Sequence, residues 1–118
     1  MIVEDNLIFR RYVKDLFKES FSDIYETSSG KEAVEKYKTK RPDIVFMDVN
    51  IEELDGIKAT KKILSEYPNA KIFMVSQYNE PKIIKAARNA GVIDYVSKDD
   101  LSKLFEVVKN YLLINIFK

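Results

Sequence analysis

Hydrophobic residues fall into two alternating patterns along this chain. Short apolar runs that stop at polar residues predict buried strands, whereas apolar residues recurring every three or four positions predict amphipathic helices. The short runs lie at residues 1–3, 24–27, 43–48, 71–76 and 92–97. The helical patterns lie at residues 7–20, 31–39, 55–67, 81–91 and 101–113. The chain therefore alternates strand and helix five times.

This alternation is typical of an α/β fold, with a parallel sheet, right-handed crossovers and helices on both faces. The run Ile44–Met47 contains no polar residue, which predicts a strand that helices cover on both sides. No repeat, linker or low-complexity segment interrupts the pattern. We therefore expect one doubly wound domain built on five parallel strands.

Polar residues that carry chemistry follow the predicted strands. The first strand ends in Glu4 and Asp5, the third in Asp48 and the fourth in Ser76, and Lys98 follows the fifth. The carboxyl ends of parallel strands meet at one edge of the sheet, where ligands bind in open α/β folds. Each residue alone has an ordinary structural explanation, such as helix capping or strand termination. Together they are expected to form one site.

Three carboxylates at one edge repel one another, so either one is protonated or a cation lies among them. Oxygen ligands with room for water suit Mg²⁺, which often accompanies phosphate oxygens. A carboxylate can accept a phosphoryl group, and phosphoryl transfer depends mainly on positioning and charge neutralisation. A metal ion, the Lys98 ammonium and the Ser76 hydroxyl would together stabilise a phosphoryl group on Asp48.

Composition narrows the chemistry that is open to the chain. The absence of Cys and His excludes disulfides, thiolate sites, a histidine base and phosphohistidine. A net charge of +1 gives no electrostatic reason to expect nucleic-acid binding. No signal peptide opens the sequence and no apolar run approaches membrane-spanning length, so we expect a cytoplasmic protein that does not bind membranes.

The sequence resembles the receiver domain of two-component response regulators over essentially its whole length. The motifs that carry this resemblance are Val3-Glu4-Asp5-Asn6, Pro42 to Asp48, Asp55-Gly56, Phe73 to Ser76, Ala90-Gly91 and Tyr95 to Lys98. The resemblance implies a flavodoxin-like strand order, 2-1-3-4-5, and a single receiver domain over residues 1–118. This domain is expected either to stand alone or to be excised from a longer regulator. The apolar tail either extends the last helix, covers a partner or, over residues 114–118, forms a linker stub.

The resemblance also implies a phosphoacceptor and a metal site. Asp48 is expected to accept the phosphoryl group. Mg²⁺, or Mn²⁺ in its place, is expected to bind Glu4, Asp5, Asp48 and the backbone carbonyl of Asn50. Beyond self-phosphorylation from small donors and autodephosphorylation, no enzyme activity is implied.

Phosphorylation would add negative charge and acceptor oxygens at Asp48. The resemblance implies that Lys98 contacts the phosphoryl oxygens or Asp48, that Ser76 is the switch hydroxyl, and that Tyr95 turns with it. The face of the fourth helix, fifth strand and fifth helix then changes by a population shift. The expected donor is a sensor histidine kinase or a histidine phosphotransfer protein. The expected target is an output domain, another partner or a second copy.

Three alternative functions stay open. A small Mg²⁺-dependent aspartyl phosphatase would also use Asp48, but such enzymes usually place a second Asp two residues later, where this chain has Asn50. A flavodoxin-like cofactor binder would hold its anionic cofactor against the acidic turn at residues 4–6, which would repel it. A degenerate receiver that binds proteins without phosphate is disfavoured by the complete set of site residues.

Four positions depart from the family pattern. Only three residues precede Glu4, which suggests a clipped start, and Ile51-Glu52 replaces the usual Met-Pro pair. Asp99 follows Lys98 where a cis-proline is usual, so we expect a trans bond there. Gln77 stands where a small residue is common, beside the expected phosphoryl pocket. We expect Gln77 to slow dephosphorylation relative to a Gln77→Ala variant.

Overall fold

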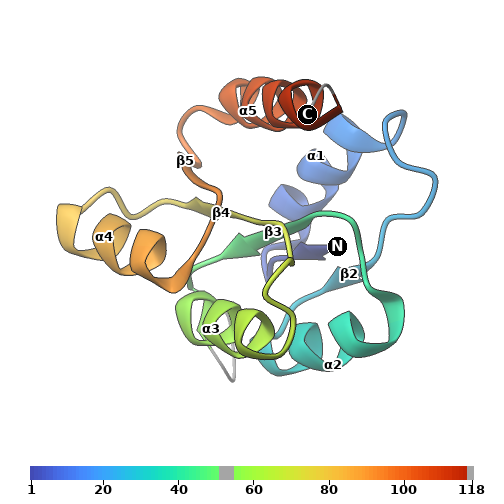
Figure 1. Cartoon of the computed structure of the whole chain (residues 1–118). Helices are drawn as coiled ribbons and strands as arrows, with labels where there is room; N and C mark the ends of the chain where they lie inside the picture. Colours follow the sequence, from blue (N-terminus) through green and yellow to red (C-terminus); the bar gives the residue numbers. More distant parts are fainter. Residues whose placement is uncertain (51–54, 117–118) are drawn as a thin grey trace.

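The structure is a computed structural model that describes residues 1–50 and 55–116. Its centre is a parallel sheet of five strands in the order β2-β1-β3-β4-β5 (Figure 1). The strands are β1 Ile2–Val3, β2 Glu26–Thr27, β3 Val45–Asp48, β4 Ile72–Ser76 and β5 Asp94–Ser97. The predicted strand order and parallel pairing are confirmed.

Five helices cover the two faces of this sheet (Figure 1). They are α1 Leu7–Phe17, α2 Gly30–Lys40, α3 Gly56–Glu66, α4 Pro81–Ala90 and α5 Leu101–Ile116. Helices α1 and α5 pack on one face, and α2, α3 and α4 pack on the other. The predicted doubly wound α/β architecture is therefore confirmed.

The strands contribute side chains to two hydrophobic cores, one on each face of the sheet. In β3, Val45 and Met47 point into the core under α2, α3 and α4, whereas Phe46 points into the core under α1 and α5. All four residues of β3 are buried. A strand covered on both faces needs apolar side chains at successive positions, which explains the unbroken run in the sequence. The packing on both sides fixes the position of Asp48.

Side chains at the helix ends explain where several helices begin and end. Asn6 Oδ1 accepts a hydrogen bond of 3.0 Å from the amide of Phe9 and caps α1. Asp55 Oδ1 accepts one of 2.9 Å from the amide of Lys58 and caps α3. Both bonds satisfy amides that have no partner within their helix. Gly91 closes α4 at φ 107°, a left-handed conformation that glycine adopts without strain.

Some element bounds differ from the predicted ones. Strand β2 covers only Glu26–Thr27, because its partner β1 offers two residues for pairing. Strand β5 begins at Asp94 rather than at residue 92, and α5 continues to Ile116 rather than ending near residue 113. The apolar tail thus extends the last helix, while the linker role of residues 114–118 stays a prediction. The Ile51-Glu52 departure lies outside the described residues.

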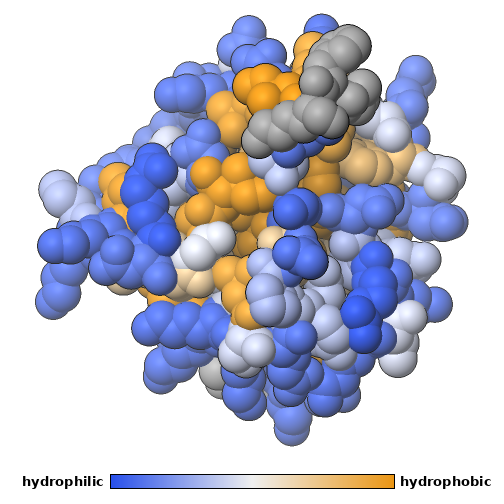
Figure 2. Space-filling model, viewed as in Figure 1, coloured by the Kyte–Doolittle hydropathy of each residue, from blue (hydrophilic) through white to orange (hydrophobic). Residues whose placement is uncertain are grey.

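The apolar tail is partly exposed. Figure 2 shows hydrophobic residues over the carboxyl-terminal part of α5, where Leu112, Leu113 and Ile114 are exposed. None of the helices in the described ranges has the length and apolar character that a membrane span requires. The bond between Lys98 and Asp99 is trans, as predicted, since the described residues contain no cis peptide bond.

Gly56 provides a test of how tightly α3 packs against β3. Its amide donates a hydrogen bond of 2.9 Å to the carbonyl of Val49, and a Cβ at this position would collide with the backbone carbonyl of Asp48. Gly56→Ala is therefore expected to lower the free energy of unfolding by about 2–3 kcal/mol, because the end of β3 must shift. Urea denaturation measures this loss. The exposed Lys61→Ala in the same helix is the control, and equal losses would contradict the packing argument.

Candidate functional site

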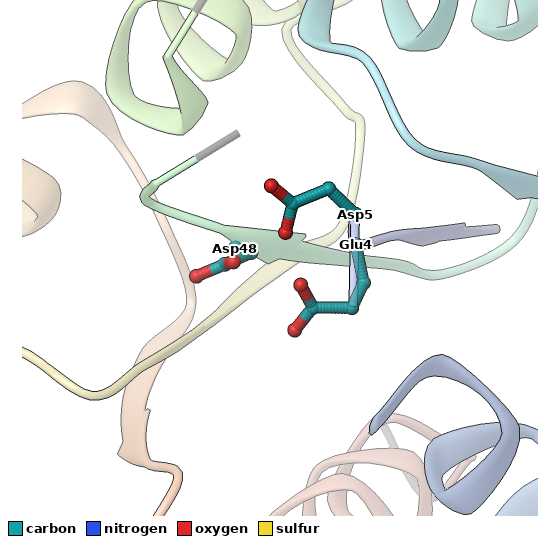
Figure 3. Close-up of side chains that lie close together, drawn as sticks. All are labelled: Glu4, Asp5 and Asp48. Carbon is teal, nitrogen blue, oxygen red and sulfur yellow. The ribbon is translucent and has the colours of Figure 1, made fainter. Parts of the chain in front are cut away.

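Three carboxylates meet beyond the ends of two neighbouring strands. Glu4 and Asp5 follow β1, and Asp48 ends β3, which pairs with β1 (Figure 3). One carboxylate oxygen from each residue lies within 4.8 Å of the others. Glu4 and Asp48 are buried, with 2% and 6% of their surface exposed, whereas Asp5 is exposed. The group is thus buried at its base and open to solvent on one side.

Lys98, which directly follows β5, brings a positive charge to this group. Its ammonium nitrogen lies 3.2 Å from Asp48 Oδ2 and 2.5 Å from Glu4 Oε1. The backbone amide of Lys98 donates a hydrogen bond of 2.8 Å to the carbonyl of Ser76, which ties the loop after β5 to β4. The lysine side chain is 16% exposed, so water screens these ion pairs only in part.

Burial dominates the electrostatics of Glu4. It raises the pKa of the Glu4 carboxyl to about 7, with the Lys98 ammonium opposing this rise and the Asp48 charge adding to it. For Lys98, burial alone would lower the pKa, but the hydrogen bond to Glu4 and the charges of Glu4 and Asp48 outweigh it and raise the pKa. One ammonium therefore does not fully compensate the two buried carboxylates.

The two carboxylate oxygens of Glu4 differ in their hydrogen bonding. Glu4 Oε2 accepts a hydrogen bond of 3.1 Å from the amide of Asn6. Glu4 Oε1 is buried and has no hydrogen bond of regular geometry among the described residues, although the Lys98 ammonium approaches it. Buried carboxylate oxygens together with an exposed third carboxylate suit a hard cation that retains some of its water. The donor set therefore fits a divalent metal ion.

The remaining site residues from the sequence lie around this group. The amide of Asn50 donates a long hydrogen bond of 3.4 Å to Asp48 Oδ1. Ser76 is fully buried at the end of β4, one residue beyond Val75, which pairs with Asp48. Asn50 and Ser76 thus both lie next to the acidic cluster.

Tyr95 is directed toward the loop that follows β4 rather than toward the carboxylates. Its hydroxyl donates a hydrogen bond of 2.5 Å to the carbonyl of Tyr78, and the amide of Tyr78 donates one of 3.0 Å to Ser76 Oγ. Ser76 and Tyr95 therefore bind the backbone of the same residue, Tyr78, at its amide and at its carbonyl respectively. This arrangement connects the edge of the acidic cluster to the segment that leads into α4.

The sequence analysis missed two residues that shape the site. Arg10 Nη1 donates a hydrogen bond of 2.9 Å to the carbonyl of Glu4, and its Nε lies 3.3 Å from Glu26 Oε1. The ring centroid of Phe9 lies 4.4 Å from the Lys98 ammonium. Hydropathy assigns both residues to faces of a helix, and the pattern does not say what each side chain touches. Phe9 and Arg10 follow Glu4-Asp5 by only four to six residues, and this closeness in sequence could have indicated that they lie near the site.

The raised pKa of Glu4 predicts a pH-dependent stability. Between pH 4.5 and about 7, folded Glu4 keeps a proton that the unfolded chain has lost. The free energy of unfolding should therefore fall as the pH rises through this window, by on the order of 3 kcal/mol from this residue alone. Glu4→Gln stays neutral at every pH, so its stability should lack this component. Metal-free urea denaturation of both proteins at several pH values measures it. Parallel curves for the two proteins would show that the Glu4 pKa is ordinary.

Comparison with known proteins places this arrangement in a family. The family model of the response regulator receiver domain matches residues 1–109. The chain is 39% identical over 99 residues to the chemotaxis protein CheY of Thermotoga maritima, and the match covers 83% of this chain and 82% of that protein.

Two solved structures are also similar to this chain. A two-component response regulator of the LuxR family from Aurantimonas gives a TM-score of 0.88 at 28% identity, covering 96% of this chain and 83% of that one. A CheX–CheY–BeF3–Mg complex from Borrelia burgdorferi gives 0.79 at 27% identity, covering 91% of this chain and 86% of that one. This chain belongs to the receiver domain family of two-component response regulators, which are phosphorylation-switched signalling modules.

Proposed function

We propose that this domain accepts a phosphoryl group on Asp48 and relays the change through the face formed by α4, β5 and α5. The observation that carries the proposal is the meeting of three carboxylates and one ammonium group at the end of β3. We further propose that Glu4, Asp5 and Asp48, with the backbone carbonyl of Asn50, bind Mg²⁺, and that Mn²⁺ can replace it. The grouping of the three carboxylates and the exposure of Asp5 support this assignment.

The chemistry follows from the charges around Asp48. A carboxylate oxygen of Asp48 attacks the phosphorus of the donor, a new P–O bond forms, and the bond between phosphorus and the leaving group breaks. Mg²⁺ held by Glu4, Asp5 and Asp48 would supply positive charge to the phosphoryl oxygens. The Lys98 ammonium, already 3.2 Å from Asp48 Oδ2, is the protein cation placed to meet these oxygens. No histidine base is needed, because positioning and charge neutralisation carry most of the catalysis.

The hydrogen bonds on Tyr78 support a route from Asp48 to the surface. A phosphoryl group on Asp48 is a strong acceptor that would draw the Ser76 hydroxyl toward it. Ser76 Oγ would then loosen its hydrogen bond with the amide of Tyr78, whose carbonyl is bound by Tyr95. The segment before α4 and the ring of Tyr95 would move together. The result is a shift between two packings of the same fold.

Partners are inferred from relatives. The Borrelia structure is a complex of CheY with CheX, and the relative DegU of Brevibacillus brevis is a transcriptional regulatory protein of which the match covers 48%. We propose that residues 1–118 form one cytoplasmic receiver domain that is phosphorylated by a histidine kinase or a histidine phosphotransfer protein. Its output is an attached domain, a separate partner or a second copy, and residues 114–118 are the candidate connection.

Phosphorylation of Asp48 is testable with a small donor. Incubation with Mg²⁺ and phosphoramidate or acetyl phosphate should add one phosphoryl group, detected by intact-protein mass spectrometry. Asp48→Ala should gain none, and removal of the metal with a chelator should slow the reaction of the wild type severely. Asp94→Ala, on β5, is a matched carboxylate control that should react like the wild type. No gain on the wild type, or an equal gain on Asp48→Ala, would contradict the proposal.

The lifetime of the phosphorylated form should depend on Gln77. This residue is exposed and directly follows the buried Ser76, next to the proposed phosphoryl site along the chain. Gln77→Ala is expected to lose its phosphoryl group several-fold faster, because a shorter side chain admits water more easily. Decay of radiolabelled phosphoprotein measures the rate. Asn79→Ala in the same loop should decay like the wild type, and an unchanged rate for Gln77→Ala would rule out shielding by Gln77.

A further inference from the structure

The Lys98 ammonium is enclosed by three groups, and only two of them are charged. Glu4 Oε1 and Asp48 Oδ2 lie at 2.5 Å and 3.2 Å, and the ring of Phe9 lies on a further side with its centroid at 4.4 Å. A cation this close to an aromatic face is attracted by the negative charge on that face. The ring thus replaces water on one side of the ammonium.

A small hollow lies beside Glu4, Phe9 and Asp48. A cavity of about 10 Å³ is lined by Glu4, Phe9 and Asp48 together with apolar residues of β1, β3, β4 and α1. A cavity of this size holds at most one water molecule. The Lys98 side chain is only 16% exposed, and the ring of Phe9 covers one side of its ammonium. Its ion pairs therefore lie largely away from water, where they are stronger than at an exposed surface.

The position of Phe9 is itself fixed from two directions. Its amide donates to Asn6 Oδ1, the cap of α1, so the first turn of the helix is anchored. Its ring packs against the core that contains Val13 and Phe46. Lysine, in contrast, has a long flexible side chain that loses considerable rotamer entropy when it is held in one place. An anchored ring is thus placed to restrain a mobile ammonium.

We propose that Phe9 is a positioning residue for Lys98. Its ring face holds the ammonium between Glu4 and Asp48, and this placement sets how fast Asp48 reacts with a phosphodonor. The effect on rate rests on the proposed function of Asp48, whereas the placement of Lys98 does not. Phe9 touches neither the donor nor the reacting oxygen in this proposal, and it acts only through Lys98.

The kinetic test compares variants that keep or remove the ring. Phe9→Leu, which preserves apolar bulk, should slow the maximal rate of Asp48 phosphorylation by phosphoramidate in Mg²⁺ by about three- to tenfold. Phe9→Tyr keeps the ring face and should retain the wild-type rate. Tyr12→Leu removes an exposed ring from the same helix and should also react normally. Urea denaturation confirms that each variant is folded before the rates are compared.

A spectroscopic test reads the contact without any phosphorylation. In protein labelled with ¹³C-lysine, the ring current of Phe9 should shift the Lys98 ε-methylene protons upfield, and Lys98→Arg identifies the signal by its loss. The shift should persist in Phe9→Tyr and vanish in Phe9→Leu. A wild-type rate for Phe9→Leu, or no upfield shift in the wild type, would overturn the proposal. A wild type that takes up no phosphate would instead refute the proposed function, and the ring-current shift would still decide whether Phe9 holds Lys98.

Discussion

The ion pairs of Lys98 with Glu4 and Asp48 are the interaction on which the rest of the site depends. They join the loop after β5 to the ends of β1 and β3, across the width of the central sheet. Two buried carboxylates without a cation would be strongly destabilising, and one ammonium offsets only part of that cost. Burial, with a smaller contribution from the Asp48 charge, raises the pKa of Glu4 in spite of the Lys98 ammonium, and the acidic group fits a metal ion. The remaining cost would be relieved by a divalent cation before any phosphoryl group arrives.

Much of the fold was predictable because its constraints are local. A strand buried on both faces requires apolar residues at successive positions, and residues 44–47 meet that requirement. Parallel topology then brings Glu4, Asp5 and Asp48 to one edge whatever the details of packing. The end of α5 was less predictable. An apolar tail looks the same in sequence whether it continues a helix or leaves it, and only the structure shows that α5 continues to Ile116.

Which residues form the site was easier to predict than which side chains contact one another within it. The sequence indicated that Lys98 would lie near Asp48, but its ammonium lies closer to Glu4. The two distances depend on the conformation of the long lysine side chain, which the sequence does not give. The hydrophobic pattern predicted a helix over residues 7–20 that contains Phe9, but such a pattern carries no information about which charge the ring contacts. Such contacts depend on burial and side-chain conformation, and the spacing of residues in the sequence determines neither.

The joint attachment of Ser76 and Tyr95 to Tyr78 has a consequence for which residues position 78 can accept. Both bonds are made to the main chain of Tyr78, one to its amide and one to its carbonyl, and neither uses its phenol. These two hydrogen bonds therefore do not depend on the phenol, whereas the Tyr78 ring packs against the core under α2, α3 and α4. Another apolar side chain that fills the same space would leave both bonds intact, whereas proline, which has no amide proton, would remove the bond to Ser76.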